Sequence, residues 1–366
     1  MNVAFIIDKF DVGGTQRQLI LLANSLATRK VGKVMMVCLQ REGALAVELS
    51  PDIQMVNLGL KRIYGTEAFS QMLSLRKRLK EWQCDVIHAF LPSANIFGSL
   101  LGKLSDIPVI VSRRDIGIYH SRLWQYLEEK VAYRLAKSIV CVSNEVKDIL
   151  LAREPALKSK TSVIPNAIDI NCADGYAQSV AVTLPVKDYM VAVGNIKPVK
   201  GYDFLMEALS GMEGNVVVIG TGEHRNAGKE LELMRELAEK NGVGGKIYFV
   251  GHKDPPEIAA IVKNARFAIH PSYSEGMSNA ILEYMVHGNT VVCRDILANR
   301  ELVTEGENGY LFRELADFKD KVNLLWRNSE KRLEMAEKAR RFVSNNHGID
   351  NIMNMSLNKY NEVVAV

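Results

Sequence analysis

Long apolar runs, clustered cysteines and low-complexity segments are all missing from this chain of 366 residues. Its longest apolar runs, such as 139–142 and 216–220, have the length of strands. They fall far short of the roughly 20 residues that a membrane-spanning helix needs. The first residues do not combine a basic start with a long apolar stretch, so no secretory signal is predicted. Together these absences predict a globular protein that stays in the cytoplasm.

Cysteine pairs at metal-binding or redox spacing are also absent. None of the five cysteines lies within four residues of another, which excludes a Cys-x-x-Cys motif and zinc-finger spacing. Scattered single cysteines are typical of a reducing compartment, and we expect them to pack as small apolar side chains. No Asp-x-Asp pair is present to hold a divalent cation, so neither a metal nor a cofactor is predicted. The cysteines are Cys38, Cys84, Cys141, Cys172 and Cys293.

A strong excess of charge of one sign is absent, since the formal net charge is +4. No basic run is interleaved with aromatic residues, so a nucleic-acid partner is not predicted. The charge is nevertheless uneven along the chain. Residues 1–165 carry 23 Lys and Arg against 15 Asp and Glu, and the remainder carries 23 against 27. The basic half is therefore a candidate for binding an anionic surface or an anionic ligand.

Short apolar runs alternate with amphipathic stretches over the whole chain. This alternation predicts an α/β protein whose parallel sheets are covered by helices on both faces. The predicted strands are 3–7, 33–39, 54–58, 86–89, 109–112, 139–142, 189–193, 215–219, 247–250, 267–269 and 291–292. The predicted helices include 15–29, 69–82, 119–135, 144–152, 202–209, 228–241 and 279–287.

The alternation pauses between about residues 165 and 187 and then starts again with a new strand. Two doubly wound, Rossmann-like domains are the simplest interpretation, one over 1–165 and one over 166–346. Ligands of such sheets bind beyond the carboxyl ends of the strands. If the two domains face each other, the site lies in the cleft between them.

Two glycine-containing loops follow predicted strands and precede predicted helices. Gly13 and Gly14 would allow close approach of the backbone to a ligand at the start of a helix. The segment 194–201 places Lys200 where the next helix begins, and a cation beside helical N–H groups is suited to a diphosphate. A tight turn without ligand and a solvated lysine are the alternatives. Gly220, in a Gly-x-Gly turn, is a weaker candidate of the same kind.

The segment 270–283, His-Pro-Ser-Tyr-Ser-Glu-Gly-Met-Ser-Asn-Ala-Ile-Leu-Glu, is the most informative of the chain. Glu275 lies in a loop, where its carboxylate can accept hydrogen bonds from sugar hydroxyls. Glu283 lies about one turn into the next helix, where it can hold a ribose diol. Between them, the N–H groups at the helix start can bind a phosphate. The residues that provide this start are Gly276, Met277, Ser278 and Asn279.

In order and spacing these segments resemble glycosyltransferase family 4, whose members are retaining GT-B enzymes. The resemblance covers nearly the whole chain and is densest over 189–312, with Glu275 and Glu283 as the Glu-x7-Glu signature. It implies that Glu275 binds donor-sugar hydroxyls, Glu283 the ribose, Lys200 the diphosphate, and Gly13 and Gly14 the donor phosphate from the other domain. It also implies that the last helix, within about 347–366, returns to the N-terminal domain. The N-terminal domain would then be the acceptor side and the C-terminal domain the donor side.

The chain departs from the family pattern at three places. Asn195 stands where the family often has Arg, which removes one cation from the donor-binding site. Arg114 stands where the family has a histidine near the sugar, and it is a candidate to replace the missing cation. His88 keeps one histidine of a common His-x-His pair, with Phe90 in the other place. We take Arg114 and His88 as candidate catalytic residues, although His88 has the alternative of a buried histidine at a strand end.

The resemblance implies a retaining, metal-independent hexosyltransferase whose donor is a nucleotide-diphosphate sugar. A UDP-sugar is the first choice of donor. The acceptor would be a lipid-linked or other saccharide in polysaccharide or glycolipid biosynthesis. Two alternatives remain open on sequence. One is a sugar-nucleotide epimerase of the same fold, which would need two acid/base groups at the sugar. The other is a catalytically silent subunit that only binds the donor.

A basic cluster in the N-terminal half predicts docking on an anionic membrane through residues 61–80. The basic residues include Lys61, Arg62 and the run 76–80 on a predicted helix. Apolar residues of the same helix form a stripe, and a core-facing stripe with a solvated basic face is the alternative interpretation. The stripe consists of Phe69, Met72, Leu73, Leu75 and Leu79.

Overall fold

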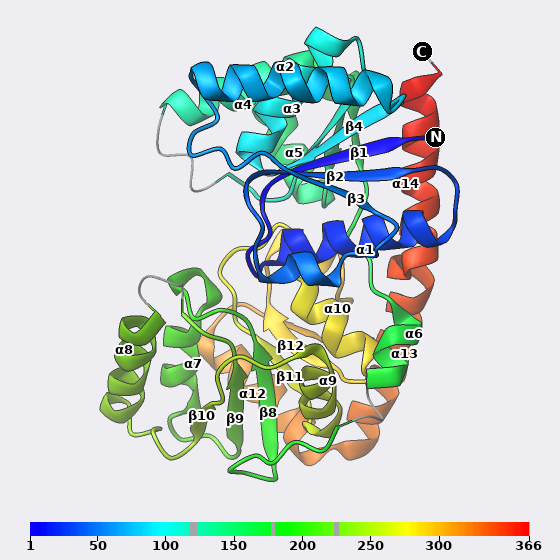
Figure 1. Ribbon diagram of the computed structural model, residues 1–366. Coiled ribbons are helices and arrows are strands. Elements are labelled where there is room, and N and C mark those ends of the chain that lie inside the picture. The colour runs from blue at the N-terminus through cyan, green and yellow to red at the C-terminus, as the bar shows by residue number, and fades with distance from the viewer. Residues whose placement is uncertain (118–122, 177–179, 223–226, 366) are drawn as a thin grey trace. The chain divides into compact units, whose positions relative to one another are not determined.

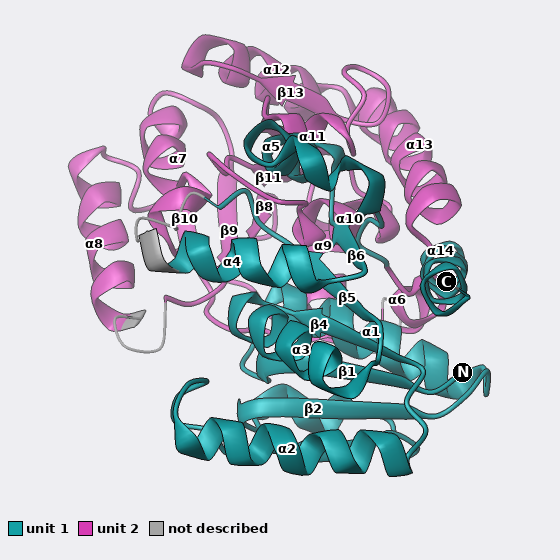
Figure 2. Ribbon diagram, turned by 90° about the horizontal axis from the view of Figure 1, so that it is seen from above, with its two compact units in different colours: residues 1–167, 349–366 teal, residues 168–348 magenta. Residues whose placement is uncertain are grey.

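The computed structural model describes residues 1–117, 123–176, 180–222 and 227–365. The chain divides into two compact units, one of residues 1–167 with 349–366 and one of residues 168–348 (Figures 1 and 2). The predicted helix 119–135 begins at Leu123 in the described part, and residues 119–122 lie outside it. The units are called unit 1 and unit 2 below.

Unit 1 contains a sheet of seven parallel strands in the order β3-β2-β1-β4-β5-β6-β7. The central strands are apolar on both faces because helices cover both, which explains the uninterrupted apolar runs in the sequence. The strands are β1 (Val3–Lys9), β2 (Val34–Arg41), β3 (Gln54–Asn57), β4 (Val86–Phe90), β5 (Val109–Arg113), β6 (Ser138–Cys141) and β7 (Thr161–Val163).

Helices of unit 1 lie in two layers. On one face α2, α3 and α4 lie side by side, and on the other α1 packs with α14, the last helix of the chain (Figures 1 and 2). Met353 and Tyr360 of α14 join the same apolar core as Phe5 of β1 and Leu19 of α1. The helices are α1 (Gly14–Thr28), α2 (Thr66–Glu81), α3 (Pro92–Ser105), α4 (Leu123–Leu135), α5 (Asn144–Arg153) and α14 (Ile349–Val364).

The outer side of α2, α3 and α4 exposes several large apolar side chains. The predicted stripe on α2 divides: Met72, Leu75 and Leu79 are buried, whereas Phe69 and Leu73 are 57% and 42% exposed. Other exposed apolar side chains of these helices are Leu104, Leu127, Val131 and Leu135. The same three helices also carry exposed basic residues, namely Lys77, Arg78, Lys80, Lys103 and Arg134. The stripe is thus half core and half surface, because a helix on a sheet buries only one side.

Unit 2 contains six parallel strands in the order β10-β9-β8-β11-β12-β13. The strands are β8 (Tyr189–Val193), β9 (Asn215–Ile219), β10 (Ile247–Phe249), β11 (Ala268–His270), β12 (Val291–Arg294) and β13 (Tyr310–Phe312). The α-helices are α6 (Ile170–Tyr176), α7 (Tyr202–Leu209), α8 (Ala227–Lys240), α9 (Pro255–Asn264), α10 (Asn279–Val286), α11 (Leu297–Arg300), α12 (Leu315–Arg327) and α13 (Ser329–His347). Since β8 lies next to β11, the loops that follow these two strands leave the same edge of the sheet side by side.

Two edge strands were not predicted. β7 and β13 are short edge strands that are only partly buried, so they lack the fully buried apolar run of the central strands. Because β7 follows β6, the segment at Ser143 does not close the last strand of unit 1. Ser143 instead caps α5, with its hydroxyl accepting a hydrogen bond from the Val146 N–H.

The described helices include none with both the length and the apolar character of a membrane-crossing segment.

Candidate active site

Lys200 is held at the carboxyl edge of the unit 2 sheet by a short, tightly packed loop. The loop leaves β8 after Val193 and forms a single 3-10 turn, Pro198–Lys200, before α7 begins. Gly201 follows with φ +69°, and an added Cβ there would overlap the carbonyl oxygen of Pro271. Only glycine accepts both constraints. The loop of Lys200 therefore lies directly against the loop that follows β11.

A second contact ties these two loops together. The Tyr273 N–H donates to the Val199 carbonyl at 2.8 Å. The β11 loop then enters α10, where the Ser278 hydroxyl caps the helix by accepting from the Ile281 N–H at 3.3 Å. Both loop geometries are fixed by backbone contacts, so the side chains between them have defined positions.

Glu275 lies at the centre of this pair of loops. Its Oε1 atom is 2.6 Å from Lys200 Nζ and 3.1 Å from His270 Nε2, and the side chain is only 12% exposed. Burial alone would raise the pKa of Glu275, but the charge of Lys200 and the hydrogen bond from His270 hold it well below its usual range. The carboxylate is therefore ionised at neutral pH.

His270 is the last residue of β11 and is 2% exposed. Its Nε2 lies 3.1 Å from Ser278 Oγ as well as 3.1 Å from Glu275. Burial lowers the pKa of this imidazole, against the opposing effect of the Glu275 carboxylate. Sequence reasoning did not assign a role to His270, although both partners of its ring lie in the same segment, five and eight residues further along the chain.

Two buried tyrosines hold the β8 end of the site, and neither was predicted. The Tyr202 hydroxyl donates to the Gly194 carbonyl at 2.8 Å, and the Val193 N–H donates to the Tyr284 hydroxyl at 2.7 Å. Burial raises the pKa of both phenols, so they stay neutral. Tyr284 directly follows Glu283 on α10, and this neighbourhood was the one feature of the sequence that could have indicated a role for Tyr284.

The remaining predicted donor-side residues surround this pair of loops. Glu283 lies on α10 and is half-buried, and Asn195 is exposed in the loop after β8. Gly220 follows β9 with φ +152°, where an added Cβ would overlap the Gly194 carbonyl oxygen. The loop from Gly276 to Ser278 leads into Asn279, the first residue of α10. Lys200 and Glu275 are thus brought into direct contact, and Gly220 packs on the loop that contains Asn195.

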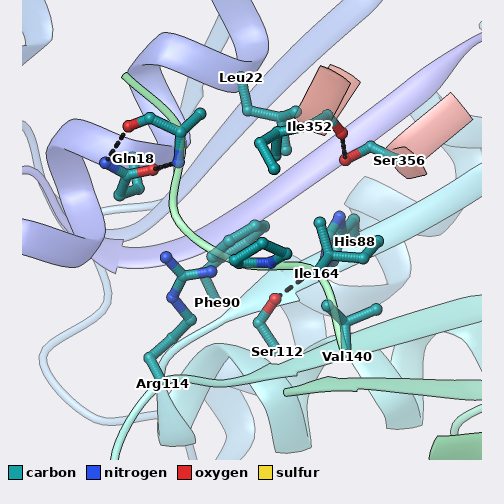
Figure 3. A pocket seen from close by; sticks show the side chains of 12 residues that line it. Gln18, Leu22, His88, Phe90, Ser112, Arg114, Val140, Ile164, Ile352 and Ser356 are labelled. Atoms are coloured by element: carbon teal, nitrogen blue, oxygen red, sulfur yellow. Dashed lines mark hydrogen bonds between the residues drawn. The ribbon is translucent and has the colours of Figure 1, made fainter. Parts of the chain in front are cut away.

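In unit 1, His88 and Arg114 line one small cavity of about 30 Å³, room for roughly one water molecule (Figure 3). His88 comes from β4, and Arg114 follows β5. The cavity is lined by Gln18, Leu22, His88, Phe90, Ser112, Arg114, Val140, Ile164, Pro165, Ala167, Ile352 and Ser356.

Both ring nitrogens of His88 have partners inside unit 1. Nδ1 lies 2.9 Å from the Tyr360 hydroxyl on α14, and Nε2 lies 2.9 Å from Ser112 Oγ on β5. Burial, with a contribution from the charge of Arg114, lowers the pKa of His88 to about 3. His88 is therefore a neutral ring that links α14 to the sheet.

Arg114 has a different environment. Its guanidinium donates to the Asn166 side chain. It also lies 5.8 Å from the centre of the Phe90 ring, and Figure 3 shows these two side chains next to each other. Burial lowers its pKa to about 10, so it remains a cation at neutral pH. No ion pair with a carboxylate is formed by Arg114 among the described residues, whereas the neighbouring Arg113 pairs with Glu129 at 3.4 Å. Arg114 can therefore attract an anion.

Gly13 and Gly14 lie where α1 begins. Gly13 is the N-cap residue, in extended conformation, and brings no capping side chain, and Gly14 is the first helical residue. The two glycines thus lie in the turn between β1 and α1. Figure 3 shows Gln18 of the same helix facing the cavity.

Comparisons with known proteins agree with this architecture. The family model "Glycosyltransferase Family 4" matches residues 12–171, and "Glycosyl transferases group 1" matches residues 183–342. An uncharacterized glycosyltransferase of Methanocaldococcus jannaschii is 26% identical over 289 residues, 77% of each chain. The UDP-Gal:alpha-D-GlcNAc-diphosphoundecaprenol alpha-1,3-galactosyltransferase of Escherichia coli is 25% identical over 280 residues, 70% of this chain and 69% of that protein.

Among solved structures, Anabaena HepE in complex with UDP superposes with a TM-score of 0.81. The identity is 18%, and the match covers 99% of this chain and 100% of HepE. At this identity the likeness concerns the fold. Two parallel α/β sheets of seven and six strands, together with these matches, make this chain a GT-B protein and a member of glycosyltransferase family 4, a family of retaining hexosyltransferases.

Proposed function

We propose that the protein transfers a hexose from a UDP-sugar to a saccharide acceptor, with retention of configuration at the anomeric carbon. The observation that carries the proposal is the buried pair of Lys200 and Glu275 beside the start of α10. Such a group combines a cation for a diphosphate with an ionised carboxylate for sugar hydroxyls. The choice of a UDP-sugar as donor is supported by two similar proteins. HepE has been crystallised with UDP and with UDP-glucose, and the E. coli galactosyltransferase is named for UDP-Gal.

The chemical step would rest on electrostatic stabilisation of the leaving group. As the bond between the sugar and the diphosphate breaks, negative charge grows on the phosphate oxygens. Lys200 and the N–H groups from Gly276 to Asn279 would stabilise that charge. The leaving diphosphate would itself accept the proton of the incoming hydroxyl, so neither a covalent nucleophile nor a metal is required by the proposal. Glu283 would hold the ribose, and Gly13, Gly14 and Gly220 would leave room for the donor phosphates.

Arg114 is proposed to supply the cation that Asn195 does not provide. Support comes from its remaining positive charge and from the lack of a carboxylate partner among the described residues. His88 would act through shape: a neutral ring with both nitrogens engaged fixes the cavity wall beside Arg114. Arg114 would thus contact substrate, whereas His88 would position it.

The acceptor is proposed to be a lipid-linked saccharide reached from an anionic membrane surface. The outer side of α2, α3 and α4 supports this, since Phe69 and Leu73 are exposed beside the basic run 76–80. An apolar and basic helical face can lie on an anionic leaflet without crossing it. The E. coli relative, named for a diphosphoundecaprenol acceptor, supports the same class of acceptor. The protein would then work at the cytoplasmic side of the membrane, in polysaccharide or glycolipid synthesis.

A thermal-shift screen with UDP-, GDP-, ADP- and dTDP-sugars tests the donor assignment. UDP and at least one UDP-hexose should raise the melting temperature, because a ligand that binds only the folded state stabilises it. Turnover of the stabilising donor then separates the alternatives. Transfer with retention supports the proposal, isomerisation of the donor would indicate an epimerase, and binding without turnover would indicate a silent subunit.

A further inference from the structure

Two hydrogen-bond donors meet at a single oxygen of Glu275. Lys200 Nζ and His270 Nε2 both approach Oε1, at 2.6 and 3.1 Å. None of the hydrogen bonds among the described residues uses Oε2 of the same carboxylate. An ionised carboxylate only accepts hydrogen bonds, so Oε2 is left to receive a hydroxyl from a ligand.

The geometry fixes which nitrogen of His270 carries the hydrogen. Because Oε1 cannot donate, Nε2 must donate to it, and the neutral ring is then the Nε2–H tautomer. Ser278 Oγ, 3.1 Å from the same nitrogen, holds the ring from the start of α10. Burial keeps the pKa of this imidazole low, in agreement with a neutral ring.

The two donors differ in how firmly they are held. His270 is 2% exposed, and its backbone is paired with Cys293 of β12 in the middle of the sheet. Lys200 reaches Oε1 through a flexible four-carbon stem and is 23% exposed. If Lys200 turns its ammonium towards a bound diphosphate, its contact with Glu275 Oε1 weakens. The hydrogen bond from His270 to the same oxygen then remains.

We propose that His270 is a positioning residue, whose Nε2–H fixes the Glu275 carboxylate so that Oε2 faces the donor sugar. This inference rests on the proposed function, because it assigns the sugar to Oε2. His270 touches neither the diphosphate nor the sugar; it acts through Glu275. Its loss should therefore affect recognition of a nucleotide sugar more than recognition of the nucleotide alone.

Two variants of His270 and one control test this. His270→Leu removes the donor, whereas His270→Gln keeps an N–H near the position of Nε2. His287→Leu, at the far end of α10, controls for the loss of a partly buried neutral histidine. For each protein, calorimetry gives the Kd of UDP and of UDP-glucose or UDP-galactose, whichever the wild type binds. Release of UDP from that donor gives kcat and KM.

For His270→Leu we expect kcat/KM to fall about ten- to hundredfold, the range for loss of a hydrogen bond to a charged group. The Kd of UDP should stay within about twofold of the wild type, since UDP has no sugar to orient. His270→Gln should recover most of the loss, and His287→Leu should match the wild type. Histidine ¹⁵N NMR of the wild type should show His270 as the Nε2–H tautomer, a measurement that does not depend on whether a variant folds.

Several results would overturn the inference while leaving the proposed function intact. These are equal kcat/KM for His270→Leu and His287→Leu, equal losses in UDP and UDP-sugar affinity, or an Nδ1–H tautomer of His270. A loss as large in His270→Gln as in His270→Leu would also overturn it. A wild-type protein that binds neither UDP nor any nucleotide sugar would instead refute the proposed function, and this inference with it.

Discussion

The ammonium of Lys200 lies 2.6 Å from Oε1 of Glu275, although 75 positions separate the two residues in the chain. The pair is mostly buried, with side chains 23% and 12% exposed. Removal of either partner leaves the other charge without its main counter-charge in a poorly solvated place. The two residues can be tested separately, because Glu275 is proposed to bind the sugar of the donor and Lys200 its diphosphate.

Glu275→Ala and Glu283→Ala are each expected to abolish sugar transfer while the fold is retained. The reason is that both carboxylates are proposed to hold the donor, one at the sugar and one at the ribose. Activity with the donor found by the thermal-shift screen and a native circular dichroism spectrum check this. Glu307→Ala, which removes an exposed carboxylate of unit 2, serves as control. Near-wild-type turnover in either variant would refute the assignment of the donor site.

Lys200→Ala is expected to weaken binding of UDP much more than binding of uridine. A charge-assisted hydrogen bond contributes roughly 1.5–3 kcal/mol, so the Kd of UDP should rise about ten- to hundredfold. Calorimetry with both ligands measures the difference, with Lys263→Ala on the exposed side of α9 as control. Equal losses for UDP and uridine would mean that Lys200 acts through the shape of the loop and not through the phosphates.

The raised pKa of Asp8 predicts that the free energy of unfolding depends on pH. Oδ1 of Asp8 accepts from the Ala94 N–H at 2.6 Å, and burial raises its pKa from 3.8 to about 6. The folded state thus binds this proton more tightly than the unfolded state does. The contribution of Asp8 to stability is therefore greatest below about pH 4 and is lost as the pH rises to about 6. At one pKa unit per 1.36 kcal/mol, the loss amounts to about 3 kcal/mol.

Asp8→Asn should remove this dependence, because the amide keeps an acceptor for Ala94 and carries no charge. We expect the variant to be more stable than the wild type at pH 8 and the difference to shrink towards pH 4. Urea unfolding at several pH values measures it, and Asp52→Asn, at an exposed carboxylate, is the control. A constant difference at all pH values would contradict the explanation.

Docking on a membrane can be measured by co-sedimentation with vesicles rich in phosphatidylglycerol. Each Lys or Arg near an anionic leaflet contributes about 1 kcal/mol, so binding should be weak and should disappear at high salt. It should also disappear when all four basic residues of α2 are changed to Glu and should weaken in Phe69→Ser with Leu73→Ser. The four are Arg76, Lys77, Arg78 and Lys80.

A charge-matched control is available in unit 2, where four basic residues of α8 and α9 can be changed to Glu in the same way. That variant should bind the vesicles like the wild type. The control residues are Lys229, Arg235, Lys240 and Lys263. Absence of wild-type binding at low salt would refute the docking proposal and favour a water-soluble acceptor.

Local sequence determined the alternation of strands and helices, because apolar periodicity and glycine placement act over a few residues. It also determined the character of the segment from His270 to Glu283, where a strand, a loop carboxylate and a helix start follow each other directly. It could not reveal β7 and β13, whose three residues are paired only because a longer neighbour offers an edge. Nor did it name α3, where Gly98 and Gly102 hide the helical pattern.

Contacts between distant residues were decided only by tertiary structure. Lys200 meets Glu275 because β8 and β11 are neighbours in the sheet, and no local pattern specifies that order. His88 meets Tyr360 of the last helix for the same kind of reason, since 272 positions separate the two residues. The sequence names the chemical groups of the site, but strand order decides which of them share a hydrogen bond, since that depends on positions far apart along the chain.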